Sequence, residues 1–265
     1  MADRNVIAQK ISNFNLAAEA ILNTIPTRLS VVEKEKKIFD YITTTVTYDE
    51  TAASSITSTA NITGHAFDSY GALCEKKSVC EGYSELFQYL CYCVGINSTP
   101  ISGFADGGRH MWNAVEIEGE WYQIDLTWGD AFSDNVPYYG FFNLTNSQMS
   151  AQDHVIDSEH LAVPVCTASE NAFRKAFALD VGNGSMPDNY QTVLDWLATS
   201  AEPYLYVYVG ETELSDKQLR EYFVGKKSLF GADSVVHDYM KSKGYDISIS
   251  REYSIRGEYY YFNIE

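Results

Sequence analysis

Three side chains between positions 80 and 125 could together perform nucleophilic chemistry. Cys80 lies near the start of an apolar stretch, His110 begins a β-rich run, and Asp125 lies in the next such run. A thiol, an imidazole and a carboxylate are the nucleophile, the base and the orienting acid of cysteine acyl-transfer sites. Each of these residue types alone more often has a structural role. The chemistry therefore depends on whether the surrounding elements bring the three together.

Cys80 belongs to a stretch, residues 78–95, that predicts one amphipathic helix. Ser78 followed by Glu81 matches a capping box, so we expect the helix to begin at Ser78, and Gly95 supplies the left-handed residue that ends it. The apolar face comprises Tyr83, Leu86, Phe87, Leu90 and Val94. Cys80 would then be the second helical residue, where unpaired N–H groups and the helix dipole favour a thiolate over a thiol.

Two β-rich runs, residues 110–118 and 121–128, predict a hairpin joined through Gly119. A two-residue turn made of Gly119 and the residue before it would place His110 and Asp125 on one face as diagonal neighbours. Diagonal cross-strand residues lie about 7 Å apart at the backbone, within reach of an imidazole and a carboxylate. A bulge in either strand would change this register.

The remaining patterns predict helices and strands on both sides of this region. Before residue 165 they comprise helices at 4–23, 30–46 and 68–73, a surface loop at 51–64, and strands at 99–105 and 138–144. After it they comprise helices at 169–179, 190–198, 215–222 and 234–243, with strands at 204–209, 245–255 and 258–264. We therefore predict an α+β protein with a catalytic domain at residues 1–165 and a small α+β module of unknown role at residues 166–265.

The composition indicates a folded, strongly acidic protein. Of 265 residues, 45% are hydrophobic, and 19 Lys plus Arg against 36 Asp plus Glu leave a formal charge of −17. This charge disfavours nucleic acid and anionic membrane surfaces as partners. No window resembles a membrane span, and the N-terminus lacks the regions of a signal peptide. We expect a soluble protein, cytoplasmic unless an export signal has been removed, in which case it would be extracytoplasmic or secreted.

The five cysteines predict free thiols rather than disulfides or a zinc site. Cys74 and Cys80, like Cys91 and Cys93, match no standard spacing of zinc ligands, and no histidine pair lies nearby. Cys91 and Cys93 are interpreted as small core residues. No EF-hand loop pattern occurs, so calcium dependence is disfavoured. We expect no metal and no cofactor.

Four short motifs resemble the transglutaminase-like superfamily, above all its bacterial members. They are YGAL at residues 70–73, VCEGY at 79–83, HMWN at 110–113 and WYQIDLTW at 121–128. The resemblance extends more loosely through residues 139–154. It implies a papain-like core, in which N-terminal helices and a catalytic helix pack on an antiparallel sheet. It also implies a Cys80, His110 and Asp125 triad. Met111 departs from the smaller residue common in the family.

The triad and the resemblance together predict cysteine-dependent acyl transfer on protein or peptide amides through a Cys80 thioester. A transglutaminase, a deamidase and a peptidase would all use this chemistry. The Cys80 N–H is the expected oxyanion donor, with the Tyr70 hydroxyl as a second donor or Tyr70 packed on the helix instead. Trp112 would line the substrate cleft or belong to the core. The alternative is a non-catalytic protein- or cell-surface-binding module on the same fold. Oligomeric state is left open.

Overall fold

The structure, a computed structural model, divides into two compact units, Met1–Ala172 and Phe173–Glu265. It describes residues 3–55, 64–130, 137–157, 162–168, 172–180, 194, 204–208, 235–243, 253–255 and 259–263. Cys166 is fully buried in an apolar cluster with Trp112 and Met149, so it packs within the first unit. The assignment of a catalytic domain to residues 1–165 and a separate module to 166–265 stays a prediction.

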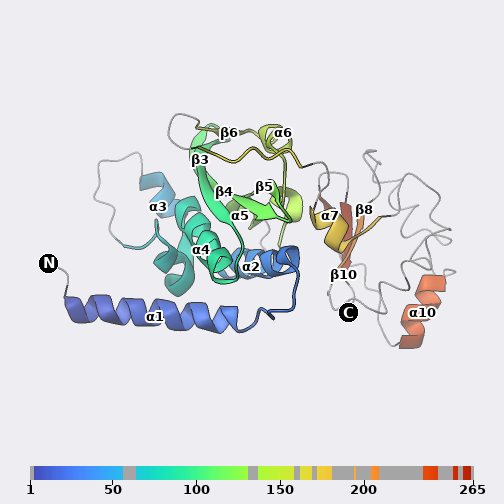
Figure 1. Ribbon diagram of the computed structural model, residues 1–265, viewed down its shortest axis with the longest axis horizontal. Coiled ribbons are helices and arrows are strands. Elements are labelled where there is room, and N and C mark those ends of the chain that lie inside the picture. The colour runs from blue at the N-terminus through green and yellow to red at the C-terminus, as the bar shows by residue number, and fades with distance from the viewer. Residues whose placement is uncertain are drawn as a thin grey trace. The chain divides into compact units, whose positions relative to one another are not determined.

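Helices form the N-terminal half of the first unit (Figure 1). They are α1 (Arg4–Leu22), α2 (Val31–Thr45), α3 (Glu50–Ser55), a π-helical turn η1 (Gly71–Glu75) and α4 (Cys80–Cys93). Two short strands, β1 (Thr47–Tyr48) and β2 (Lys77–Ser78), pair in parallel and tie the segment after α2 to the segment before α4. Ser30 and Glu33 form the predicted capping box at the start of α2. No helix in the described part of the chain is long and apolar enough to cross a membrane.

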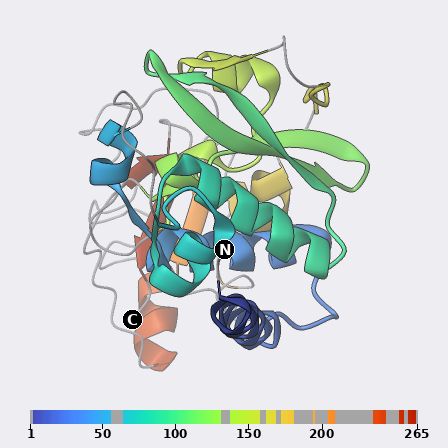
Figure 2. The ribbon, with the colours of Figure 1, turned by 90° about the vertical axis from the view of Figure 1, so that its left-hand side faces the viewer.

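An antiparallel sheet follows in the order β5-β4-β3-β6. Its strands are β3 (Ser98–Ala105), β4 (Gly108–Ile117), β5 (Glu120–Ile124) and β6 (His154–Ile156). Glu118 and Gly119 have φ values of 54° and 87°, as a two-residue hairpin turn with right-handed strand twist requires. Asn113 therefore pairs with Ile124, and the predicted register is confirmed. Figure 2 shows β3 and β4 as two long, twisted strands beside α4.

The first unit buries its largest apolar side chains between α4, α2 and the sheet. Tyr83, Leu86, Phe87 and Leu90 of α4 have no exposed surface, which confirms these four members of the predicted apolar face. Burying each such side chain is worth about 1.5–3 kcal/mol before the entropy of ordering is counted. Val94, the fifth, is the C-cap of α4 and is only partly buried. Short elements complete the unit: α5 (Leu126–Gly129), a 3-10 turn η2 (Tyr139–Phe141) and α6 (Asn146–Ser150).

Several sequence-based boundaries are wrong. The second hairpin strand ends at Ile124 and not at 128, because Asp125 caps α5. In place of the strand predicted at 138–144, the chain forms the turn η2 and then a single β-bridge between Leu144 and Gln123. The loop expected at 51–64 begins as helix α3, with residues 56–63 outside the described ones. Strand β6 lies in a stretch predicted only as polar. Cys93 is exposed and is not a core residue, because it is the last residue of α4 and lies off the buried face of that helix.

The second unit contains a four-stranded sheet in the order β7-β8-β10-β9. Its elements are α7 (Ala172–Phe177), β7 (Ala178–Asp180), β8 (Tyr204–Tyr208), α10 (Val235–Lys243), β9 (Tyr253–Ile255) and β10 (Tyr259–Asn263). The antiparallel pairing of β9 with β10 confirms the predicted closing hairpin. Residues 178–180 are a strand parallel to β8, where the sequence predicted helix. The helices predicted at 190–198 and 215–222 lie outside the described residues, apart from residue 194.

Candidate active site

Cys80 is the first residue of α4, one position nearer the helix start than the sequence predicted. Val79 is the N-cap, and the predicted capping box is wrong because the Ser78 hydroxyl donates to the Ala66 carbonyl at 2.6 Å. Gly82 allows this arrangement, since a Cβ there would lie 2.0 Å from the Ser78 hydroxyl oxygen. Cys80 is partly exposed. Its N–H belongs to the first helical turn, whose donors have no intrahelical acceptor.

His110 on β4 and Asp125 at the start of α5 meet as the hairpin register predicts. The His110 Nε2 lies 2.6 Å from the Asp125 Oδ2. The other carboxylate oxygen, Oδ1, accepts from the backbone N–H groups of Thr127 and Trp128 at 2.9 and 3.1 Å and from the Thr127 hydroxyl at 2.6 Å. The Asp125 N–H donates to the Phe141 carbonyl at 3.0 Å. The carboxylate is therefore held from several sides.

The charges of these groups stabilise one another. Burial alone would lower the pKa of His110, but the Asp125 carboxylate and then the Cys80 side chain, each through its charge and a hydrogen bond, raise that pKa. Burial would raise the pKa of Asp125, yet His110, His154 and Thr127 hold it well below its usual range. Because the His110 Nε2 is bound to Asp125, Nδ1 is the ring nitrogen left available to Cys80. His110 and Asp125 are thus in direct contact, whereas their joint action with Cys80 as a triad stays a prediction.

Two further residues of the site were missed by sequence reasoning. His154 on β6 lies with its Nε2 2.9 Å from the Asp125 Oδ2, and its side chain has no exposed surface. Tyr48 on β1 has a hydroxyl hydrogen bond to Cys80. Burial and then the charge of Cys80 raise the pKa of Tyr48 to about 12, so the hydroxyl keeps its proton. Neither residue is marked by local spacing, although His154 ends the loosely matching segment.

The two residues assigned to the cleft have other surroundings. Trp112 has no exposed surface, donates to the Gln123 side-chain oxygen at 2.6 Å and stacks near the His110 ring at 5.9 Å. Its assignment as a cleft wall is therefore wrong, and it is a core residue that supports His110. The ring centres of Tyr70 and His65 are 4.6 Å apart, and the Lys10 amine lies 5.5 Å from the centre of the Tyr70 ring. Tyr70 as an oxyanion donor stays a prediction.

Part of the chain matches the model of a known family. Residues 17–126 match the family model of the transglutaminase-like superfamily. We call this part of the chain the transglutaminase-like domain after this similarity. The match includes Cys80, His110 and Asp125, whereas His154 lies beyond it. Mixed helices and an antiparallel sheet, with the helix of Cys80 packed on β4, are consistent with the papain-like core that the motifs implied.

Two curated relatives match about half of the chain. Kyphoscoliosis peptidase from Homo sapiens is 28% identical over 147 residues, which is 49% of this chain and 21% of the relative. Its counterpart from Mus musculus is 28% identical over 149 residues, which is 49% of this chain and 22% of that relative. The chain thus spans about a fifth of the length of these relatives.

Two solved structures also resemble the chain. One, a crystal structure of a TGase, is 16% identical with a TM-score of 0.38 over 69% of this chain and 44% of that one. The other, a putative cysteine protease from Cytophaga hutchinsonii, is 22% identical with a TM-score of 0.33 over 47% and 43%.

One group among the described residues of the first unit has the residue types of a metal site. The ligand atoms of His110, Asp125 and His154 lie within 4.8 Å of one another. Each of these atoms is already hydrogen-bonded, and the side chains of Asp125 and His154 are 1% and 0% exposed. A metal ion would have to replace these hydrogen bonds in a closed space. The donor set therefore fits a hydrogen-bonded network better than a metal centre.

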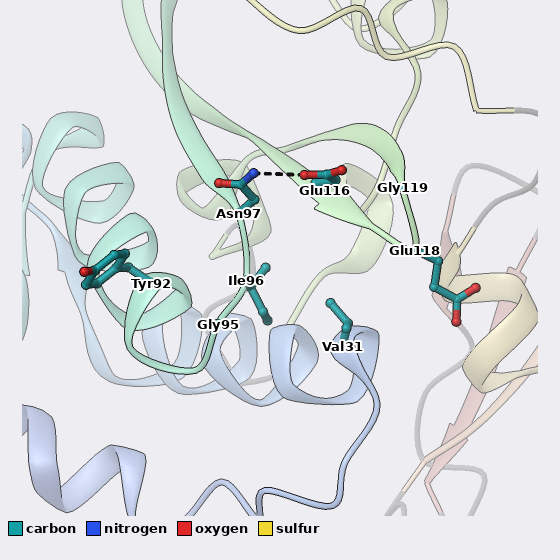
Figure 3. Close-up of a pocket in the computed structure, with 8 residues that line it drawn as sticks. All are labelled: Val31, Tyr92, Gly95, Ile96, Asn97, Glu116, Glu118 and Gly119. Carbon is teal, nitrogen blue, oxygen red and sulfur yellow. Dashed lines mark hydrogen bonds between the residues drawn. The ribbon is translucent and has the colours of Figure 1, made fainter.

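A separate hollow of about 420 Å³ lies between the end of α4 and the β4–β5 turn (Figure 3). Tyr92, Glu116 and Glu118 line it together with Val31, Gly95, Ile96, Asn97 and Gly119. The Asn97 side chain donates to Glu116 at 2.9 Å, as the dashed line in Figure 3 shows. Cys80, His110 and Asp125 do not line this hollow. It is therefore not the reaction site.

Proposed function

We propose that the transglutaminase-like domain transfers acyl groups from protein or peptide amides through a thioester on Cys80. The observation that supports this most is the 2.6 Å contact between His110 and Asp125, together with the effect of the nearby Cys80 side chain in raising the pKa of His110. A binding module would not need all three groups in contact. The two curated relatives are named peptidases, and their name favours amide substrates.

In the first half-reaction His110 takes the Cys80 proton, and the thiolate attacks the amide carbonyl carbon. The carbonyl π electrons move to oxygen, which the Cys80 N–H and the Tyr48 hydroxyl stabilise. The C–N bond then breaks, and the proton held by His110 goes to the leaving amine. A thioester and a free amine result. Asp125 keeps the imidazole oriented and stabilises its charged form throughout.

In the second half-reaction an acceptor attacks the thioester carbon while His110 takes its proton. Water as the acceptor gives hydrolysis or deamidation, and a primary amine gives a crosslink. The proton returns to the Cys80 sulfur as the C–S bond breaks. The same residues perform all of these reactions, so access of the acceptor to the thioester decides the product.

The test is incubation of the protein with a peptide library and a primary amine, followed by mass spectrometry. Cleavage, deamidation or amine incorporation would each identify the acceptor, and Cys80→Ala should show none of them. Tyr92→Ala, in the separate hollow, is the matched control that should retain activity. If no product depends on Cys80, the acyl-transfer proposal fails and a binding module becomes the better interpretation.

A further inference from the structure

We propose that His154 is a doubly protonated positioning residue that holds Asp125 in place and shares its negative charge with His110. Its importance for turnover rests on the function proposed above, whereas its protonation state does not. His154 enters the site from β6, which pairs with β3 on the side of the sheet away from β5. The Asp125 Oδ2 therefore receives one imidazole from β4 and another from β6.

Both ring nitrogens of His154 face atoms that can only accept a hydrogen bond. Nε2 lies 2.9 Å from the Asp125 Oδ2, and Nδ1 lies 2.7 Å from the Gln152 carbonyl oxygen. A neutral imidazole carries hydrogen on one nitrogen only and would leave two acceptors facing each other. The Asp125 carboxylate already faces the His110 ring at Oδ2 and accepts from Thr127 and Trp128 at Oδ1, so it supplies no proton. His154 must then carry both.

The surroundings of His154 suit a buried cation. The rings of Trp112 and Trp128 each lie 5.2 Å from the His154 ring, at 90° and 69°, and the Phe141 ring lies at 5.5 Å. The faces of aromatic rings attract a nearby cation. The charged or titratable groups on the adjoining elements are Asp125, His110 and, at the ends of β4 and β6, the Arg109–Asp157 ion pair at 3.6 Å. Asp125 is the anion in direct contact.

A cationic His154 changes what Asp125 does for His110. With a Cys80 thiolate and a His110 imidazolium, the site contains two positive and two negative groups, which lowers the cost of burying them. The ring centres of His110 and His154 are 5.6 Å apart, so each cation disfavours the other. His154 therefore holds the carboxylate in place while weakening its pull on the His110 proton, which His110 must later release to the leaving amine.

The direct test is NMR of ¹⁵N-histidine-labelled protein carrying Cys80→Ala, which removes the thiolate. Only five histidines are present, and single His→Gln variants assign them. We expect both His154 nitrogens to bear hydrogen across neutral pH, and Asp125→Asn to make His154 lose one of them. A wild-type His154 with one bare nitrogen at neutral pH would overturn the proposal, whatever reaction the protein performs.

The second measurement is the titration of His110 in His154→Gln, which keeps a donor for Asp125 but removes the charge. Loss of a cation at this distance should raise the midpoint of the His110 titration by about one to two pH units. If the protein turns over substrate, the fall of activity at alkaline pH should move to higher pH in the same way. A purely structural role would leave the midpoint unchanged or lower it, and either result would overturn the proposal. His65→Gln, at a partly exposed histidine bonded to Asp68 at 2.6 Å, is the matched control.

Discussion

At the scale of single residues, the site is a network centred on the Asp125 carboxylate. Its Oδ2 accepts from His110 and His154, and its Oδ1 accepts from Thr127 and the start of α5. A carboxylate that accepts this many hydrogen bonds stays ionised even when fully buried. In the proposed reaction, Cys80 needs only one member of this network, His110, as its proton acceptor.

Replacing Asp125 by Asn should reduce turnover by roughly 10- to 10³-fold. This is less than the loss of about 10⁴-fold that the same change of the triad aspartate causes in a serine protease. The amide cannot serve both imidazoles as an acceptor, but Cys80 and His110 can still exchange the proton. Initial rates on an identified peptide, with circular dichroism to verify folding, would measure this. Unchanged turnover in a folded variant would leave a dyad of Cys80 and His110.

The Tyr48 hydroxyl is predicted to act mainly in the transition state. Tyr48→Phe should lower kcat by about 10²- to 10³-fold, the usual effect of losing one oxyanion donor, with little change in KM. Tyr92→Phe, at an 81% exposed position, is the control. A large rise in KM at constant kcat would show that Tyr48 binds substrate and does not stabilise the oxyanion.

Cys80 should be the thiol most readily alkylated at mildly acidic pH. Burial raises the pKa values of the Cys74, Cys91 and Cys166 thiols, whereas Cys80 is partly exposed and hydrogen-bonded to His110. Iodoacetamide labelling mapped by peptide would test this, with His110→Gln expected to slow labelling of Cys80. Equal rates at Cys74 and Cys80 would contradict it.

At the scale of elements, α2 carries a buried carboxyl that should make stability depend on pH. Burial raises the pKa of Glu35 to about 8, although the Asn143 amide donates to it at 2.9 Å. Because this pKa lies above the unfolded value near 4.5, the unfolded state releases the proton first. Glu35 therefore contributes stability at low pH that is progressively lost as pH rises. Between about pH 4.5 and pH 8, the free energy of unfolding should fall by roughly 1.4 kcal/mol per pH unit.

Glu35→Gln should flatten this dependence and stabilise the protein at pH 8, as urea unfolding across pH would show. Glu33→Gln on the same helix is a control of opposite sign. Hydrogen bonds from Ser30 lower the pKa of Glu33, so its contribution is lost as pH falls. An unchanged pH profile in Glu35→Gln would mean that Glu35 is ionised or that the denatured state masks its effect.

At the scale of the whole molecule, the residues of the site all belong to the first unit. Cys166 is a buried member of the apolar cluster that contains Ile101, Trp112 and Met149. The Asn146 N–H donates to the Cys166 carbonyl at 2.8 Å. A cut at residue 165 would remove this contact. A cut at residue 172 would retain it.

A fragment of residues 1–172 should therefore fold and retain rapid alkylation of Cys80. A fragment of residues 1–165 should be less stable, since it exposes the apolar surface that Cys166 covers. Thermal unfolding of the two fragments and of the full chain would measure the difference. An unfolded 1–172 fragment would show that the first unit depends on residues 173–265.

Local patterns in the sequence were sufficient for the hairpin and for the residues that it carries. The hairpin register depends only on neighbouring residues, because it follows from the positive φ angles at Glu118 and Gly119 and from the two-residue alternation of strands. This register places His110 beside Asp125. The apolar face of α4 follows in the same way from helical spacing. The motifs added Cys80, and with it the transglutaminase-like family.

Tertiary structure alone decided where α4 begins and which groups complete the site. The Ser78 hydroxyl is bound to Ala66 and Ser78 pairs with Tyr48, so Val79 became the N-cap and Cys80 the first helical residue. Tyr48 and His154 reach the site from strands separated from Cys80 and Asp125 by about thirty residues each. No local spacing predicts contacts that depend on pairing distant strands, because packing of the whole unit selects them.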